Sequence, residues 1–150
     1  MVHPPTRQLR ISRRIGTFTA IAALIALTTV GCSPDQNRTN DVLLINQERA
    51  AAAGAGLSWD DELGDKAQVW ADHIADAGGL SHSVLTDGIT SDWTTLGENV
   101  GTGADLGGVH GQFMGSPKHR AAILNRQFRS VGVGYAVRGD QVYVVEEFRG

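Results

Sequence analysis

Three side chains in this sequence carry groups that could bind a metal ion or move a proton. They are two imidazoles, at His82 and His119, and one carboxylate, at Glu98. Neutral imidazole nitrogens and carboxylate oxygens are common ligands of divalent metals such as zinc. A serine hydrolase is not indicated, because no Gly-x-Ser-x-Gly motif surrounds the serines near these histidines, Ser81, Ser83 and Ser116.

The residues around His119 predict a helix start that holds its imidazole at a fixed angle. Pro117 suits the first helical position, because its missing N–H would be unpaired there in any case. The hydroxyl of Ser116 is expected to cap the same helix. Ile123 and Leu124 then fall on the buried face, so we expect a helix over residues 116–124.

The spacing of apolar residues along the rest of the chain predicts helices in the first half and a β-hairpin at the end. Apolar residues recur at helical spacing in the first half of the chain, and they alternate with other residues near its end. The expected elements are helices over 42–53, 60–77 and 105–113, a short strand over 96–100, and strands over 131–137 and 142–148 joined by a turn at 138–141. This order favours an α+β domain whose sheet is covered by helices.

A few other side chains are expected to have structural or solvated positions. Trp59 and Trp70 are predicted to lie in the core, and His110 and Lys118 at the surface. The acidic run 60–62 is expected to mark a helix start, where negative charge suits the helix dipole.

The first 32 residues have the composition of an export signal. Four Arg precede an uncharged, mostly apolar run over residues 15–30, which ends at Gly31-Cys32. A small residue before a lone cysteine resembles the lipobox of bacterial lipoproteins. That resemblance implies a lipoprotein signal peptide over 1–32, export, and acylation of Cys32. Two or three acyl chains would anchor the protein stably at the outer face of the cell membrane, with residues 33–40 as a tether. The alternatives are an ordinary signal peptide and an uncleaved N-terminal anchor.

The charge and the cysteine content limit what kind of domain the residues after Cys32 can form. The chain has a formal charge of −3, and its first 32 residues hold four Arg and no acid, so the remainder carries −7. Such an acidic domain is a poor candidate for binding nucleic acid. Since Cys32 is the only cysteine, no disulfide forms within the domain. Residues 41–150 suffice for one core, and not two.

Seven motifs in one order carry a family resemblance over residues 41–150. They are Asn46-Gln47-Glu48-Arg49, the series Leu57…Trp59…Leu63…Ala67…Trp70-Ala71, His82-Ser83, Gly97-Glu98-Asn99-Val100, Ser116-Pro117-x-His119-Arg120-x-x-Ile123-Leu124, Phe128-x-x-Val131-Gly132-Val133-Gly134 and Val145-x-x-Phe148. Together they resemble the CAP superfamily, also called SCP/PR-1, in its bacterial form. The resemblance implies an α-β-α sandwich with a compact antiparallel sheet flanked by helices.

The resemblance also implies a site. Family members have an open cavity lined by two His and two Glu. The two His correspond here to His82 and His119, and one Glu corresponds to Glu98. The second Glu falls at about Ser116, so this chain departs from the family pattern and retains three of the four groups. The retained trio could bind zinc or another divalent metal and leave one coordination position open.

Three functions remain open at this point. The first is a binding module that holds a small apolar or amphipathic, lipid-like ligand or a cell-wall component in the cavity. The second is a metal-assisted hydrolase of peptide or wall substrates, for which His82, Glu98 and His119 would be the zinc ligands. The third is a structural or interaction domain without a small ligand. The incomplete set of site residues favours a role without catalysis.

Overall fold

The computed structural model describes residues 33–150, so the predicted signal peptide and Cys32 lie outside the described part. The elements, in chain order, are α1 (Pro34–Ala51), β1 (Ser58–Trp59), α2 (Asp61–Ala77), β2 (Leu96–Gly103), α3 (Leu106–Gly115), α4 (Pro117–Ile123), β3 (Ser130–Arg138) and β4 (Gln141–Arg149). Within residues 33–150, none of the helices combines the length and apolar character that crossing a membrane requires.

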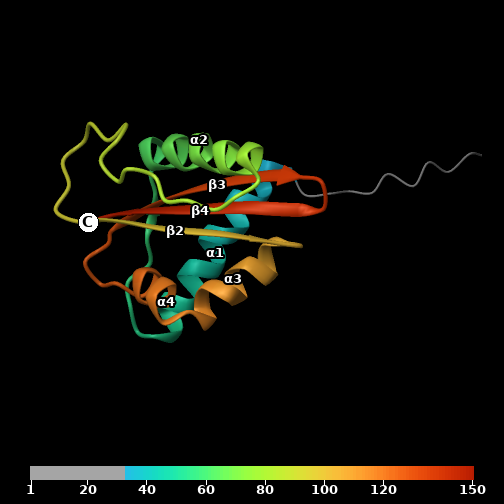
Figure 1. Cartoon of the computed structure of the whole chain (residues 1–150). Helices are drawn as coiled ribbons and strands as arrows, with labels where there is room; N and C mark the ends of the chain where they lie inside the picture. Colours follow the sequence, from blue (N-terminus) through green and yellow to red (C-terminus); the bar gives the residue numbers. More distant parts are fainter. Residues whose placement is uncertain (1–32) are drawn as a thin grey trace, which may run out of the picture. The chain divides into compact units, whose positions relative to one another are not determined.

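The four strands form one sheet between two layers of helices. The strand order is β1-β3-β4-β2, and α2 covers one face while α1, α3 and α4 lie on the other (Figure 1). This arrangement confirms the predicted α+β class and the α-β-α sandwich. One detail was wrong, because the sheet is mixed: the two-residue strand β1 pairs with β3 in parallel, and only the longer strands are antiparallel.

The sheet divides the apolar interior of this single domain into two cores, one on each face, where the sequence predicted one. The larger core lies on the side of α1, α3 and α4 and includes Phe113, Val133 and Phe148. The smaller core lies under α2 and is built largely from small side chains such as Ala67 and Ala71. Small residues let helix and sheet approach closely, so α2 lies nearer to the strands than larger side chains would allow.

Two glycines of β3 account for this close approach. A Cβ atom on Gly132 would lie 2.1 Å from the backbone nitrogen of Gly64, and one on Gly134 would lie 2.0 Å from the carbonyl oxygen of Ala67. Both contacts are far below van der Waals distance and involve helix backbone, which cannot rotate away. The Val131–Gly134 motif therefore fixes α2 on the sheet.

The predicted tether over residues 33–40 is wrong, because α1 already begins at Pro34. Ser33 caps the helix, with its Oγ accepting a hydrogen bond of 3.2 Å from the backbone N–H of Gln36. The apolar pattern predicted a helix start at residue 42 because the first two turns of α1 are polar. A serine followed by proline is nonetheless a strong helix start.

The motif at residues 46–49 proves to be structural. The Asn46 side chain exchanges hydrogen bonds with the backbone of Leu57, at 3.0 and 2.7 Å. The buried Arg49 guanidinium donates to the carbonyl oxygens of Ala55, Ile123 and Asn125, at 2.6–2.9 Å. These two side chains tie α1 to the segment before β1 and to the end of α4.

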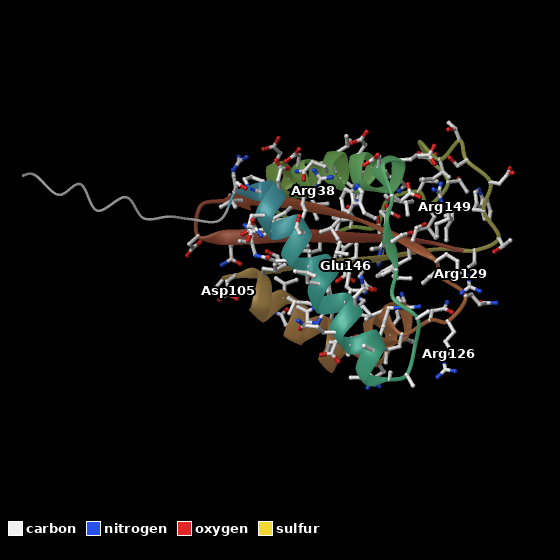
Figure 2. All side chains as sticks on the ribbon, turned by 180° about the vertical axis from the view of Figure 1, so that it is seen from behind. Arg38, Asp105, Arg126, Arg129, Glu146 and Arg149 are labelled. Carbon is white, nitrogen blue, oxygen red and sulfur yellow. The ribbon has the colours of Figure 1, made fainter. Side chains whose placement is uncertain are left out.

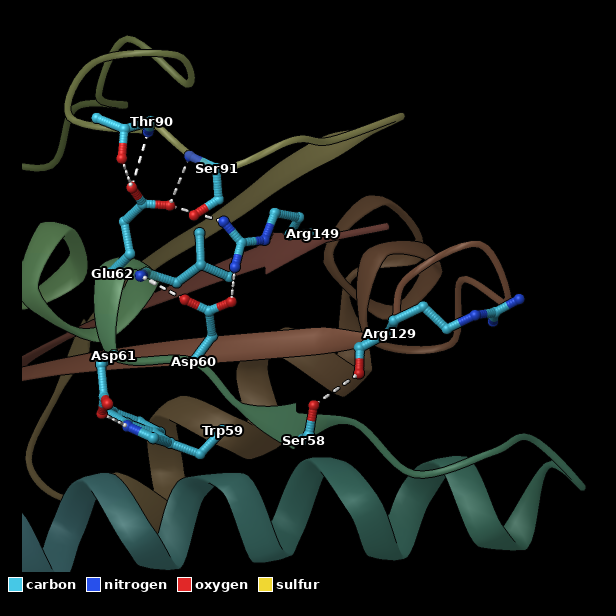
Figure 3. A network of polar contacts seen from close by, with 10 residues as sticks. Ser58, Trp59, Asp60, Asp61, Glu62, Thr90, Ser91, Arg129 and Arg149 are labelled. Carbon is cyan, nitrogen blue, oxygen red and sulfur yellow. Dashed lines mark hydrogen bonds and ion pairs between the residues drawn. The ribbon is translucent and has the colours of Figure 1, made fainter.

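The acidic helix start at residues 60–62 is confirmed, and it also anchors the loop that carries His82. Asp60 caps α2 by accepting from the N–H of Leu63 at 3.1 Å, and Arg149 of β4 pairs with both Asp60 and Glu62 (Figure 3). Glu62 in turn accepts from the backbone N–H and the hydroxyl of Thr90, at 2.7 and 2.6 Å. The loop between α2 and β2 is thereby held against the start of α2, which Arg149 joins to β4.

Two of the four expectations for single side chains were wrong. Trp59 is 41% exposed, with Arg38 stacked over its ring, and His110 is buried rather than solvated. Trp70 is half-buried, and Lys118 is exposed as predicted. Trp59 lies on the two-residue edge strand β1, which has no further strand to cover it.

Candidate functional site

The structure brings two of the predicted site residues into direct contact. The Nδ1 atom of His82 lies 2.5 Å from Oε1 of Glu98. The backbone N–H of Ser83 also donates to the Glu98 carboxylate, at 3.1 and 3.2 Å. The Glu98 side chain is 1% exposed, whereas the His82 side chain is open to solvent. Glu98 therefore holds His82 and the adjoining loop on strand β2.

A second carboxylate, which the sequence motifs did not predict, lies beside Glu98. Glu147 of β4 is paired in register with Glu98 of β2. Lys66 of α2 donates to its Oε1 at 2.6 Å, and the hydroxyl of Ser83 donates to the same oxygen at 3.1 Å. Burial raises the pKa of Glu147 to about 7, and the charge of Glu98 adds to this effect while Lys66 opposes it. A buried polar network thus joins α2, the loop, β2 and β4.

One sequence signal could have identified Glu147. The run Val142-Tyr143-Val144-Val145-Glu146-Glu147-Phe148 has apolar residues on both faces of the strand, as expected for a strand covered on both sides. Two adjacent acids inside such a run place one carboxylate on each face. Buried carboxylates need partners, so each predicts a polar cluster.

The polar network lies next to two adjoining cavities. One, of about 420 Å³, is lined by His82, Ser83, Leu85, Gly97, Glu98, Asn99, Lys118 and Ala122. The other, of about 610 Å³, lies between α2 and the loop and is lined by Glu62, Asp65, Lys66, Val69, Trp70, Ser83, Val84, Asp87 and Gly88. Ser83 contributes to both. We call the first the polar cavity, after His82, Glu98 and Asn99, and the second the apolar cavity, after the exposed apolar side chains Val69 and Val84 among its charged neighbours.

His119 lies near the polar cavity but is not among the residues that line it. Its ring packs edge-on against Phe113, with centroids 5.2 Å apart, and its carbonyl oxygen accepts from Asn99 Nδ2 at 3.2 Å. Burial lowers the pKa of His119, and the charges of His82 and Lys118 lower it further. His119 is therefore an electrostatic neighbour of the site.

Ser116 does not have the predicted role as a side-chain cap. It forms no side-chain cap bond to α4, and it lines neither cavity. The reason is that Ser116 ends α3 and starts α4 at once: its N–H bonds to the carbonyls of Gln112 and Phe113, and its own carbonyl accepts from Arg120. Backbone groups make this junction, and Pro117 at the first position of α4 is as expected.

The predicted zinc ligands do not form a ready coordination site. Among residues 33–150, the group of three ligand-bearing side chains whose atoms lie within 4.8 Å of one another does not include His82, Glu98 or His119. The Glu98 carboxylate already accepts from His82 and from the Ser83 N–H. These residues do not fit a zinc ion in this arrangement, and no catalytic step through a metal follows from them.

Comparison with known proteins agrees with this architecture. A sequence profile of the cysteine-rich secretory protein family, CAP, matches residues 42–148. Among proteins with curated descriptions, none matches the chain by sequence.

Solved structures of three similar proteins share the fold. An outer surface protein of Borrelia burgdorferi has 19% identity and a TM-score of 0.68, with 78% of this chain and 94% of that chain covered. The venom allergen-like protein 4 of Schistosoma mansoni has 14% identity and a TM-score of 0.67, with 76% and 88% covered. An extracellular protein of Bacillus anthracis that contains an SCP domain has 25% identity and a TM-score of 0.64, with 79% and 44% covered. By its family profile and its fold, the chain belongs to the CAP family.

Proposed function

We propose that this protein is an exported, lipid-anchored binding module that holds a single-chain amphiphile with an anionic head group. The observation that carries the proposal is the pairing of an apolar cavity with a polar one that shares a wall at Ser83. Ligand sites of about this size are mostly apolar and contain a few placed polar groups.

The apolar end of the ligand would lie between α2 and the loop. Val69 is 70% exposed and Val84 is 61% exposed, and both line the apolar cavity together with the half-buried Trp70. Large apolar side chains exposed next to one another often mark a binding surface. Covering them with an acyl chain would stabilise the complex by about 25 cal/mol for each Å² of apolar surface removed from water.

The charges around the two cavities favour one orientation of the bound ligand. The exposed Lys118 lines the polar cavity, and none of the ion pairs within residues 33–150 includes it. The rim of the apolar cavity carries Asp65 and Asp87, which would repel an anion placed there. Glu98 also lines the polar cavity, but its carboxylate is 1% exposed and already bonded to His82 and Ser83, so the exposed Lys118 ammonium is the charge that a head group would meet there. The anionic head group is therefore placed beside Lys118, with the chain directed toward Val69.

The proposed export and membrane anchoring are supported by the sequence of the first 32 residues and by two proteins of similar fold. Gly31-Cys32 closes the apolar segment of residues 15–30, and Cys32, as the N-terminal residue after cleavage, would carry the acyl chains. The two bacterial proteins of similar fold are an outer surface protein and an extracellular protein. A membrane-anchored domain with an acyl-chain cavity would meet its ligand at the membrane surface.

Binding of dodecanoate and of dodecylamine to residues 33–150, measured by calorimetry, tests the head-group preference. We expect dodecanoate to bind more tightly than the amine. Replacing Lys118 with Met should weaken dodecanoate binding about two- to fivefold, as expected for one partly exposed charge pair, and leave amine binding unweakened.

Arg120→Met is the matched control, because Arg120 is an exposed cation on the same helix that does not line the polar cavity. It should leave dodecanoate binding unchanged. Equal losses in the two variants, or tighter binding of the amine, would contradict the assigned head-group position.

A further inference from the structure

Three ionisable side chains meet inside the larger core, away from the site described above. Asp41 of α1 and Glu146 of β4 are fully buried, and His110 of α3 is 7% exposed. Figure 2 shows Glu146 on the sheet, beneath helix α1. Atoms of the three residues lie within 4.8 Å of one another, with one potential ligand atom from each.

Most polar atoms of this cluster lack a hydrogen-bond partner in the described part of the chain. They are both carboxylate oxygens of Asp41, both ring nitrogens of His110 and Oε1 of Glu146. The contact between His110 Nδ1 and Asp41 Oδ1 is 3.7 Å, which is too long for a hydrogen bond. Buried polar groups almost always have partners, and an ion or a water molecule inside the cluster would supply them to these five atoms.

The remaining oxygen of the cluster is held in place. Asn99 Nδ2 donates to Glu146 Oε2 at 2.7 Å, which leaves Oε1 directed to other partners. The same amide group donates to the carbonyl oxygen of His119. Ligands of protein-bound metals are usually oriented by hydrogen bonds of this kind.

The charge of the cluster matches a divalent cation. Two carboxylates and one neutral imidazole around an ion of charge +2 form a neutral group, which the apolar surroundings favour. Without a cation, burial raises the pKa of Asp41, and burial together with the charge of Asp41 raises that of Glu146 well above its usual value. One imidazole nitrogen and two carboxylate oxygens are a ligand type that zinc accepts.

We propose that Asp41, His110 and Glu146 bind a divalent transition-metal ion that fastens α1, α3 and β4 together. The ion would have a structural role, since the cluster is buried and does not line the polar or the apolar cavity. It would supply the crosslink that a domain without disulfides otherwise lacks.

The test is titration of the full chain, kept in detergent, with Zn²⁺ after removal of metal by a chelator. We expect one equivalent of zinc to bind and the melting temperature to rise as zinc saturates the site. Cobalt(II) in place of zinc should give visible absorption bands from a low-symmetry site with nitrogen and oxygen ligands. Asn99→Ala should weaken zinc binding about 10- to 100-fold, as removal of an orienting partner commonly does.

The double variant Asp41→Asn/Glu146→Gln keeps the shape of both side chains and should lose zinc binding. Because it also removes the buried negative charge, it should remain folded without metal, which circular dichroism would verify. The control His82→Gln/His119→Gln should keep the bound zinc. A folded wild-type chain that binds no zinc would overturn the proposal, and a proton shared by the two carboxyl groups would then explain the cluster. Zinc lost in the control but kept in the double variant would also overturn it.

Discussion

Replacing Lys66 with Met is expected to lower the free energy of unfolding by about 3–5 kcal/mol at pH 8, the usual cost of breaking a buried ion pair by removing one partner. The side chains of Lys66 and Glu147 are 7% and 2% exposed, and their charged atoms lie 2.6 Å apart. Without the ammonium group, the Glu147 carboxylate would remain buried beside Glu98 with only the Ser83 hydroxyl as a donor. Urea unfolding of residues 33–150 measures the loss.

The free energy of unfolding that Lys66→Met loses should be larger at high pH than at low pH. Because the pKa of Glu147 is raised to about 7 in the folded chain, the folded state holds this proton more tightly than the unfolded state does. Its ionisation therefore destabilises the fold as pH rises from about 4.5 to about 7. At pH 5 Glu147 is mostly protonated, so Lys66→Met should cost less there than at pH 8.

A second substitution separates the ion pair from simple packing. Lys66→Met/Glu147→Gln removes both charges, so it should recover much of the stability that Lys66→Met loses at pH 8. A loss that is the same at pH 5 and pH 8, and that the second substitution does not reduce, would show that Lys66 contributes through its methylene chain alone.

Replacing Gly134 with Ala should destabilise the domain by about 3 kcal/mol or more, at or above the upper end of the usual cost of overpacking. The added Cβ would lie 2.0 Å from the carbonyl oxygen and 2.3 Å from the carbonyl carbon of Ala67. Relief requires α2 to move off the sheet, which would also separate Lys66 from Glu147. Thermal and urea unfolding both measure this change.

Gly111→Ala is the matched control for this substitution. A Cβ on Gly111 has no neighbour within 4 Å, and the residue lies inside helix α3. Alanine there should stabilise the helix by about 0.5–1 kcal/mol. Equal stability of the Gly134→Ala variant and the wild type would mean that α2 is not in backbone contact with β3.

Much of the fold could be predicted from the sequence because local signals agree with the tertiary structure. The apolar stripe of α2, the Asp105 cap of α3 and the turn at Gly139 each follow from residue types and spacing. The two-residue strand β1 could not be predicted, because its pairing with β3 depends on contacts that are distant in sequence. The burial of His110 was missed for the same reason, since its neighbours Asp41 and Glu146 come from the two ends of the domain.

The candidate site was predicted only in part, and chiefly through the family resemblance. His82 and Glu98 do meet, but no spacing rule links residues 16 positions apart across a loop. The Lys66–Glu147 pair joins residues 81 positions apart. His119 and Ser116 were placed correctly near a helix start, whereas their side-chain orientations depend on Phe113 and on how α3 meets α4.

If α2 and the loop 80–91 hold an acyl chain, Val69→Glu should disrupt its binding. Leu43→Glu is the control, because Leu43 is a similarly exposed apolar residue, at 55%, on a helix that covers the opposite face of the sheet. Dodecanoate binding to residues 33–150 should weaken at least about tenfold in Val69→Glu, since a charge would lie in the acyl site. Leu43→Glu should bind as the wild type does. Unchanged binding in Val69→Glu, or no dodecanoate binding by the folded wild-type domain, would show that α2 and this loop do not hold an acyl chain.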